Sequence, residues 1–452
     1  MKEEKRRTEP GWSPAPPAEA HLPRRVWGAT LLSACARQWS ALCTFLTLAV
    51  LARALTSDDF GRFTFYLAWL SFLDVFVDCG TSTVAVQRGA SNPAAFAAAL
   101  SAGRRVRFGA ALLGGAVLAS SAALGHEQDL VWVCLAALGP LARVPEMSAV
   151  VFQRDIAWGM PLLLRAFGAS ARLCAVVLLT RRDDLGFGPF LLVHAWGLAL
   201  GNVAVHFVAR ERLPPRAPAL HGMLALALPP ALIGLLQQAY FWADNAFVRA
   251  FAGEAELGRY NAAVRVFQWL AFFAAFATTS ALPWLARRHE EGELGAAVTR
   301  LAQPLFAGAC AAAGLLLPWS GVLLGFAFGP GFDAAAPSLR WLLAALAMVF
   351  PGAVFLTALL AAGRARAALG VTALALFVNL AGNALLVPRS GSEGAALMTL
   401  LTESTVTFAS LFALRSLGAW PSGSAWRWLL GPLAFALSLP LSRALFVALF
   451  PA

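Results

Sequence analysis

Ten charged side chains lie within long apolar stretches of this 452-residue sequence. An ionised group at the centre of a bilayer costs about 2.5–3.5 kcal/mol, so ten uncompensated charges would cost about 25–35 kcal/mol. The charges must therefore pair with one another or face a water-filled cavity. Arginine binds phosphate or carboxylate oxygens through two parallel N–H bonds, and a carboxylate can orient an arginine or take up a cation. The ten are Arg37, Asp74, Asp78, Arg143, Glu146, Arg165, Arg172, Asp244, Arg265 and Glu403.

The spacing of these residues predicts pairs. Arg143 and Glu146 are three residues apart, which permits an ion pair within one helix. Asp74 and Asp78 are four apart and share one helix face. Arg37 and Asp78 lie at matching depths on the two sides of a hairpin that turns near residues 57 and 58, so we expect them to approach each other.

A second depth match pairs Asp244 with Arg265 across a hairpin that turns near residue 254. Two roles stay open for this pair, holding helices together or facing a cavity. For Arg37 and Asp74 a cavity is favoured, because Asp74 has no cation at matching depth on the first helix. The predicted cavity residues are Arg37, Asp74, Asp78, Arg165 and Arg265; the predicted structural pairs use Arg143, Glu146 and Asp244; Glu403, Asn379 and Asn383 are further polar residues in the membrane, the two asparagines as interhelical hydrogen-bond partners.

The elements that carry these residues are apolar helices. Hydrophobic residues make up 59% of the chain and charged residues 13%, with a mean hydropathy of +0.68, whereas a soluble domain has about 45–50% and 25%. Apolar runs of about 20 residues recur throughout and are long enough to span a bilayer. This composition excludes a disordered chain, a coiled coil, a disulfide scaffold and a membrane-anchored soluble enzyme. No Cys or His has metal-ligand spacing, so no metal site is predicted.

We therefore predict an all-α polytopic membrane protein with about 13 spans, within a range of 12–14. A polar, proline-rich and basic segment, residues 1–25, is expected to be a disordered cytoplasmic tail. The predicted spans are 27–52, 62–87, 106–125, 130–152, 159–180, 189–209, 222–250, 259–285, 301–325, 334–362, 367–388, 393–415 and 426–449.

The distribution of basic residues predicts the orientation. The formal net charge is +11, but the basic residues lie mostly in short loops between spans, so this excess does not indicate nucleic-acid binding. With a cytoplasmic N-terminus, 21 Lys and Arg lie on the cytoplasmic side and seven on the other, as the positive-inside rule requires. The seven are Arg53, Arg62, Arg181, Arg182, Arg249, Arg259 and Arg389.

Two loops in different halves of the chain resemble each other. Residues 53–63 read RALTSDDFGRF and residues 249–260 read RAFAGEAELGRY, an offset of about 197 residues with one insertion. An even number of predicted spans lies between them, so the halves share one topology and should be related by an axis along the membrane normal. The predicted units are a six-helix bundle at 26–209, a cytoplasmic linker at 210–221, a second six-helix bundle at 222–415 and an additional segment at 416–452.

The segment LARALTSDDFGRF followed by FVDCGTSTVAVQR resembles the first hairpin of bacterial polysaccharide flippases, in the multidrug/oligosaccharidyl-lipid/polysaccharide exporter superfamily. Further resemblance lies in VFQRDIAWGMPLLLRAFGASARL, DNAFVRAFAGEAELGRYNAAVRVFQ, FGPGFDAAAPSLRWL and PRSGSEGAALMTLL. It covers residues 27–415 in the family's order. Members have twelve or fourteen spans, and the single predicted span after residue 415 departs from both.

The resemblance implies a transporter rather than an enzyme. It would flip a polyprenyl-diphosphate-linked oligosaccharide across the bacterial cytoplasmic membrane for O-antigen (lipopolysaccharide), capsule or exopolysaccharide assembly. Alternating access between two bundles, a driving proton or sodium ion, and contact with membrane lipids and other polysaccharide assembly proteins are implied with it. No organic cofactor is expected.

Three alternatives stay open. A drug exporter or a peptidoglycan-precursor flippase of the same superfamily would have the same fold. A drug exporter for lipophilic cations would favour acidic and aromatic residues over the arginines seen here. A polysaccharide polymerase or glycosyltransferase is the alternative from another class, but such membrane enzymes usually carry a long outside loop, and the predicted outside loops are short.

The charge asymmetry generates a topology prediction. Reporter fusions after residues 56, 127, 184 and 255 should report the outside, and fusions after residues 95, 213, 290 and 365 the cytoplasm, because basic loops stay cytoplasmic. Alkaline phosphatase and fluorescent-protein fusions measure this directly. Reversal at two or more of the eight sites would overturn the predicted orientation.

Overall fold

The computed structural model describes residues 22–89, 93–125, 129–154, 159–182, 185–214, 222–418 and 428–449. Within these residues every regular element is a helix and no strand is present. The predicted tail at 1–25 lies mostly outside the described residues, but its last four belong to the first helix, which begins at Leu22 with Pro23 as its second residue. Proline suits this position because the first turn of a helix leaves its N–H groups unbonded. The predicted linker at 210–221 is described only as far as residue 214.

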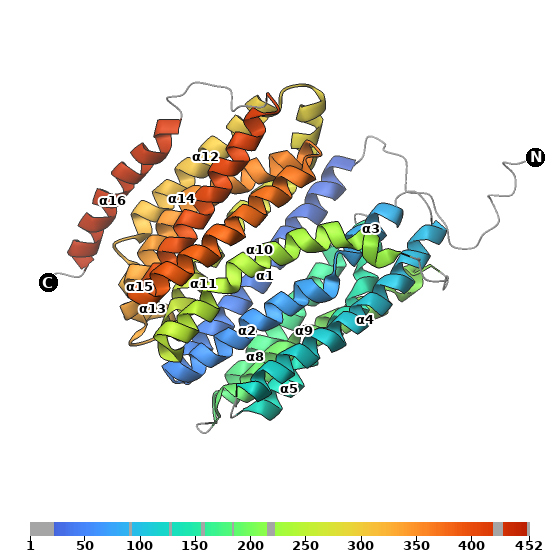
Figure 1. Ribbon diagram of the computed structural model, residues 1–452, viewed down its shortest axis with the longest axis horizontal. Helices are drawn as coiled ribbons and strands as arrows, with labels where there is room; N and C mark the ends of the chain where they lie inside the picture. The colour runs from blue at the N-terminus through green and yellow to red at the C-terminus, as the bar shows by residue number, and fades with distance from the viewer. Residues whose placement is uncertain are drawn as a thin grey trace, which may run out of the picture.

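The first half of the chain contains long helices and two interrupted ones (Figure 1). They are α1 (Leu22–Ala54), α2 (Ser57–Asp78), α3 (Thr81–Gly89), α4 (Pro93–Leu124), α5 (Leu130–Ala137), α6 (Arg143–Glu146), α7 (Val150–Arg154), α8 (Gly159–Leu179) and α9 (Phe187–Ala209), with the short 3₁₀ segments η2 (Gly139–Ala142), η3 (Met147–Ala149) and η4 (Arg210–Arg212).

The second half lies beside the first, and its last helix packs at one edge of the molecule (Figure 1). Its helices are α10 (Met223–Ala252), α11 (Glu254–Glu290), α12 (Leu294–Leu316), α13 (Ser320–Phe328), η5 (Phe332–Ala335), α14 (Ala336–Ala361), α15 (Ala365–Arg415) and α16 (Leu430–Leu449).

Two interruptions in the first half place charged residues inside the protein. The chain breaks between α2 and α3 at Cys79 and Gly80, whose φ values of 46° and 66° lie in the left-handed region. The span from α5 to α7 is broken into short helical pieces around Pro140 and Pro145, because proline lacks the N–H that a continuous helix needs. Arg143, next to this second break, thereby reaches the interior.

Two sharp changes of direction shape the second half. Helices α12 and α13 are bent by 78° relative to each other. Helix α15 is two helices joined at Gly391, where φ is 55° and ψ is −138°. The Ser392 N–H donates to Oε1 of Glu256 over 2.7 Å, and a Cβ on Gly391 would lie 2.4 Å from the same oxygen. Only glycine fits this turn.

Helical segments occupy all thirteen predicted ranges, but several boundaries differ. By length and hydropathy, seven of the described helices qualify as spans, or eight if the bent α12–α13 pair counts as one; α15 joins two predicted spans. The count of thirteen therefore stays a prediction. The largest boundary error concerns α4, which begins at Pro93 instead of near residue 106. Three arginines at 104, 105 and 107 interrupt the apolar run there and concealed the first part of the helix.

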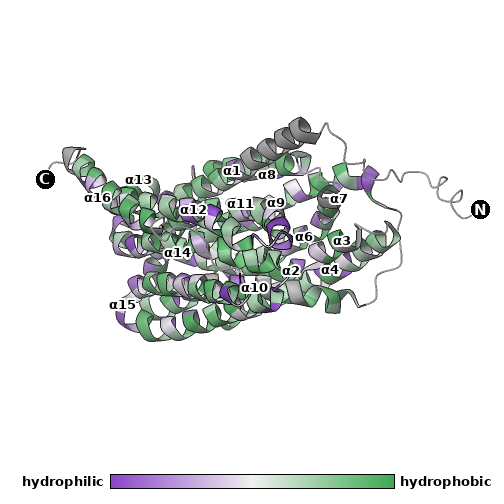
Figure 2. Ribbon diagram, turned by 90° about the horizontal axis from the view of Figure 1, so that it is seen from above, coloured by the Kyte–Doolittle hydropathy of each residue, from purple (hydrophilic) through white to green (hydrophobic). Residues whose placement is uncertain are grey.

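Most of the helical ribbon has the colour of hydrophobic residues (Figure 2), as expected for a multi-pass membrane protein. The additional helix α16 packs against α12: Trp319 Nε1 donates to Ser442 Oγ over 2.8 Å, and a Cβ on Gly314 would lie 3.0 Å from the Phe435 carbonyl oxygen. Four leucines at four-residue spacing are exposed on its other face: Leu433, Leu437, Leu441 and Leu445. This face suits contact with lipid chains.

Candidate functional site

A cavity of about 520 Å³ lies between the first-half helices α1, α8 and α9 and the second-half helix α11. Four arginines line it: Arg143, Arg165, Arg172 and Arg265. No acidic side chain is among its described lining residues. Polar and aromatic groups complete the wall, including Ser40, Thr44, Asn202, Gln268, Phe45, Trp269 and Phe272.

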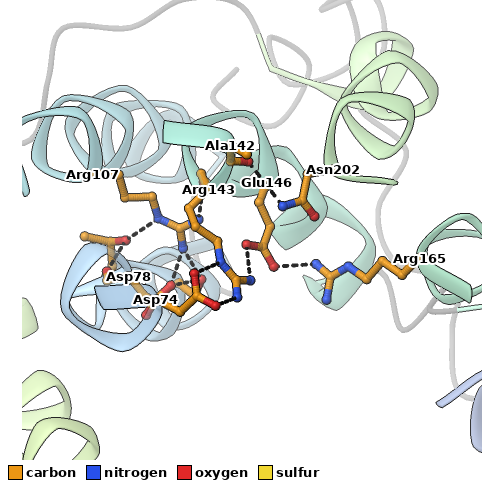
Figure 3. Close-up of polar contacts among 10 residues, drawn as sticks. Asp74, Asp78, Arg107, Ala142, Arg143, Glu146, Arg165 and Asn202 are labelled. Carbon is orange, nitrogen blue, oxygen red and sulfur yellow. Dashed lines mark hydrogen bonds and ion pairs between the residues drawn. The ribbon is translucent and has the colours of Figure 1, made fainter. Parts of the chain in front are cut away.

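Two of the four arginines are neutralised from behind (Figure 3). Arg143 bonds both carboxylate oxygens of Asp74, over 2.8 Å from Nε and 2.5 Å from Nη2. Its Nη1 donates to Glu146 over 2.7 Å, which is the expected pair within one span. The other Glu146 oxygen accepts from Arg165 over 2.7 Å. One chain of alternating charges, Asp74–Arg143–Glu146–Arg165, therefore backs this side of the cavity.

A further arginine secures this chain. Arg107 on α4 is 2% exposed, pairs with Asp78 and donates to the carbonyl oxygen of Arg143 over 2.9 Å. It also donates to the hydroxyls of Thr81 and Ser82, over 3.0 and 2.6 Å. The break between α2 and α3 thus supplies Arg107 with acceptors from both sides. Arg107 fixes the backbone that carries Arg143.

The other two cavity arginines have no carboxylate partner in the described structure. Arg172 donates to Thr44 Oγ1 over 2.7 Å, and its buried Nε has no partner. Arg265 donates to Gln268 Oε1 over 2.7 Å and lies 5.1 Å from the centre of the Trp242 ring, while its Nε and Nη2 are buried without a partner. Gly197 makes room for Arg172, because a Cβ there would lie 2.9 Å from Arg172 Cδ.

The formal charge of the cavity follows from these contacts. Four lining arginines are balanced by two carboxylates behind the wall, which leaves a charge of +2. The surplus belongs to Arg172 and Arg265, whose open N–H groups are costly to leave unbonded when buried. The wall of the cavity therefore carries a net positive charge.

The expected pair of Asp244 with Arg265 is wrong. Asp244 instead accepts a hydrogen bond from the Tyr260 hydroxyl and one from the Asn245 N–H, the latter over 3.0 Å, and no ion pair links it to Arg265 in the described residues. Asp244 on α10 lies against the side of α11 that faces the rest of the second half, where Tyr260 bonds it. Arg265 lies on the other side of α11 and lines the central cavity. Equal depth does not place two side chains on facing surfaces.

Asp244 lines a second and much smaller cavity, of about 20 Å³, among α10, α11, α14 and α15. Glu403, Tyr240, Tyr260, Asn379, Thr399 and Thr402 also line it. Asn383 Nδ2 donates to Asn379 Oδ1 over 3.1 Å, and Asn379 Nδ2 donates to Thr402 Oγ1 over 3.3 Å. Asn379 thus forms the expected bond between the two arms of α15, whereas the described bond of Asn383 lies within one arm.

The structure places only some of the predicted cavity residues on the wall of the central cavity. Arg165 and Arg265 line the central cavity, whereas Asp74 and Asp78 are engaged by arginines beside it. Asp78 pairs with Arg107. Arg37 lies on α1, but its side chain is outside the described part of the structure, so its contact with Asp78 stays a prediction.

Sequence spacing predicts no role in the site for Arg107 or Arg172. Arg107 is the second residue of the predicted span 106–125, whereas the structure places it 14 residues after the helix start at Pro93. Arg172 is one of the ten charges within apolar stretches, without a predicted partner. A signal existed for it: seven residues separate it from Arg165, which places both on one face of a helix.

One protein family and several solved structures are similar to this chain. A family described as polysaccharide biosynthesis protein matches residues 27–119. The lipid II flippase MurJ, in an inward closed conformation, aligns with a TM-score of 0.71 and 12% identity over 92% of this chain and 99% of its own. A MOP superfamily transporter from Pyrococcus furiosus aligns with a TM-score of 0.63 and 12% identity, over 87% and 95% of the two chains. A point variant of the Vibrio cholerae MATE transporter VcmN aligns with a TM-score of 0.54 and 16% identity, over 86% of this chain and 98% of its own.

The chain has the MOP-superfamily transporter fold. No curated protein matches the sequence. At identities of 12–16% these alignments establish the fold alone, and any function must be argued from the cavity.

The contacts generate a prediction about energetic coupling. Asp78→Asn alone should destabilise the protein strongly, by about 3–5 kcal/mol, because it leaves the buried Arg107 guanidinium without its carboxylate. Arg107→Gln alone should cost less, because the Asp78 side chain that it leaves unpaired is 38% exposed. The double variant should lose less than the sum, with a coupling of about 0.5–3 kcal/mol. Thermal unfolding of the purified variants in detergent measures both quantities.

The matched control is the pair Asp244→Asn and Arg265→Gln, which share no contact. Their effects on unfolding should add within about 0.5 kcal/mol. Strong coupling in this second pair, or none in the first, would contradict the described contacts.

Proposed function

We propose that this protein is a flippase that moves a polyprenyl-diphosphate-linked oligosaccharide across the cytoplasmic membrane for O-antigen, capsule or exopolysaccharide assembly. The observation that carries the proposal is the cavity, in which four arginines and no described acidic residue line the wall. The family match at residues 27–119 supports a polysaccharide precursor. The likeness to a lipid II flippase supports a lipid-linked cargo.

The charge of the cavity suits a diphosphate that bridges a lipid and a sugar. Such a group carries one ionised oxygen on each phosphorus atom, and Arg172 and Arg265 supply the two uncompensated positive charges. Arginine binds phosphate oxygens bidentately through its planar fork. The buried and unbonded Nε of Arg172, and Nε and Nη2 of Arg265, are the donors available for those oxygens.

The remaining wall offers groups for a sugar. Trp269 lies one helical turn beyond Arg265 on α11 and is 40% exposed, so its ring faces open space next to the proposed phosphate site. Asn202 and Gln268 provide amide groups near the same arginines. Arg37 stays a proposed contributor because it lies one turn before Ala41, which lines the cavity from α1. Residues of both halves would thus bind the diphosphate and sugar. Alternating access between two bundles requires such a shared site.

The rival functions make different demands on the cavity. A carrier of lipophilic cations would need acidic groups on the wall, and the described wall has none. A peptidoglycan-precursor flippase would bind the same lipid diphosphate, so the two cargoes differ only in the sugar that the diphosphate carries. The solved structures cited above give no support to a membrane polymerase, since they are named as a flippase and a transporter.

The coupling ion is part of the proposal. Asp74 is fully engaged with Arg143, whereas Asp244 and Glu403 have no arginine partner in the described structure and line the small second-half cavity. A space of about 20 Å³ suits one water molecule or small ion. Its wall presents carboxylate, phenol and amide oxygens, which suit a proton or a hard cation such as sodium. We therefore place the driving ion there. No group of three or more His, Cys, Asp or Glu side chains that could hold a metal occurs in the described residues.

Removing the two surplus charges should stop transport without unfolding the protein. A hydrogen bond from a charged group contributes about 1.5–3 kcal/mol, so Arg172→Gln and Arg265→Gln should each reduce flipping about 10-fold to 100-fold. Arg172→Lys and Arg265→Lys should retain partial activity, because charge remains but the bidentate fork is lost. Reconstituted proteoliposomes carrying a polyprenyl-diphosphate oligosaccharide measure the rate.

Arg366→Gln is the matched control, since Arg366 is exposed and away from the cavity; its rate should equal that of the unmodified protein. Full activity of both cavity variants would remove the diphosphate from the proposal. Rescue of a strain lacking this chain identifies the cargo, because only the polymer whose precursor it flips will return to the cell surface. Restoration of peptidoglycan synthesis instead would favour the rival flippase.

A further inference from the structure

The two copies of the sequence repeat touch each other at the end of the molecule where α1 turns into α2 and α10 into α11. An offset of 197 residues aligns Gly61 with Gly258 and Thr64 with Asn261. A Cβ on Gly258 would lie 3.0 Å from the Gly61 nitrogen, and Asn261 Nδ2 donates to Thr64 Oγ1 over 3.1 Å. Equivalent positions of two related units meet where the axis relating them passes. The pseudo-two-fold axis therefore runs through this crossing of α2 and α11.

The crossing is closed by direct backbone contact. A Cβ on Gly61 would lie 1.8 Å from the carbonyl oxygen of Glu254, and one on Gly258 would lie 2.6 Å from that of Ser57. No side chain larger than hydrogen fits at either glycine. Next to the glycines, Thr64 and Asn261 are 0% exposed, so neither water nor a cargo passes between the helices there.

Two arginines of the first half hold the second half at the same end. Arg53 donates to the carbonyl oxygens of Phe326 and Ala327 at the end of α13, where a helix carries partial negative charge. Arg62 lies 3.6 Å from a Glu254 carboxylate oxygen and also contacts Asp59 and Asp129 in its own half.

Arginines of the second half also lie at this interface. The repeat equivalent of Arg53 is Arg249, which pairs within its own half with Glu254 over 2.7 Å and lies 4.1 Å from the centre of the Phe65 ring of the first half. Arg259, the equivalent of Arg62, has no ion pair with any described residue. Arg53, Arg62 and Arg249 therefore all contact the opposite half at this end.

The crossing lies directly beyond the end of the central cavity. Along α11, Gly258 and Asn261 precede Arg265, the first cavity residue of that helix. At 1.5 Å per residue, Gly258 and Arg265 are about 10 Å apart along the helix axis. The cavity is therefore closed at this end by the repeat residues themselves.

We propose that the α2–α11 crossing is the gate of this transporter on the side of the membrane opposite the N-terminus. The glycine contact is its seal, and Arg53 and Arg62 are its latch. Opening separates Gly61 from Gly258 across the axis and releases both arginines from the second half. The proposal rests on the proposed function only in requiring a transporter with alternating access, and it is independent of the cargo.

The first test measures access to the cavity without any substrate. In a background with all six cysteines replaced, Ala41→Cys places a reporter thiol on the cavity wall. Gly258→Val should raise the rate at which a membrane-impermeant maleimide, added on the side opposite the N-terminus, labels this thiol by about tenfold, because the added side chain forces the backbones apart. Gly308→Val is the control, since a Cβ at Gly308 meets no atom within 4 Å. Equal labelling in the two variants would overturn the proposal.

The second test locks the crossing and does not depend on a substitution that opens it. Thr64→Cys and Asn261→Cys, combined in the cysteine-free background, should form a disulfide on oxidation that stops transport, and a reductant should restore it. Each single variant should be indifferent to the oxidant. Normal transport by the cross-linked protein, or failure of the two thiols to cross-link, would contradict a gate at this place. Because labelling needs no cargo, loss of the proposed substrate would leave the first test standing, and loss of the gate would leave the cargo assays standing.

Discussion

The cost of placing charge in a bilayer governs how the first half of this protein is built. Three acids within its spans are each matched to an arginine: Asp78 to Arg107, Asp74 to Arg143, and Glu146 to both Arg143 and Arg165. Such pairing turns charges that would each cost about 2.5–3.5 kcal/mol into a connected and rigid network. Because every described acid near the central cavity is engaged in this way, Arg172 and Arg265 are left as a net positive surface facing the cavity.

Breaks in the helices make this network geometrically available. A continuous helix between residues 130 and 154 would keep its backbone carbonyls bonded within itself, but the proline-interrupted path instead offers the Arg143 carbonyl to Arg107. The left-handed residues at Cys79 and Gly80 bring Thr81 within reach of the same guanidinium. The breaks in the helices and the pairing of charges therefore depend on each other, and together they support one wall of the cavity.

The sequence predicted the class of fold, the pair of Arg143 with Glu146 and two of the cavity arginines, because these follow from hydropathy, local spacing and the cost of buried charge. Depth matching failed for Asp244 and missed the pair of Asp78 with Arg107, since it compared only neighbouring helices of one hairpin. Arg107 comes from α4, and Asp244 faces away from Arg265. Which face a side chain occupies depends on packing between distant helices, and spacing along the chain carries no record of it. The repeat was visible in the sequence, but the contact between its two copies at the pseudo-two-fold axis was not.

The central claim is that the surplus charge of the cavity recognises a diphosphate, and direct binding tests it best. The purified protein should be titrated with polyprenyl diphosphate, polyprenyl monophosphate and the uncharged polyprenol, with binding followed by native mass spectrometry in matched detergent. The account predicts that the diphosphate binds most tightly, the monophosphate more weakly and the alcohol weakest, with the differences shrinking as salt is added. Equal binding of all three lipids, unaffected by salt, would contradict it.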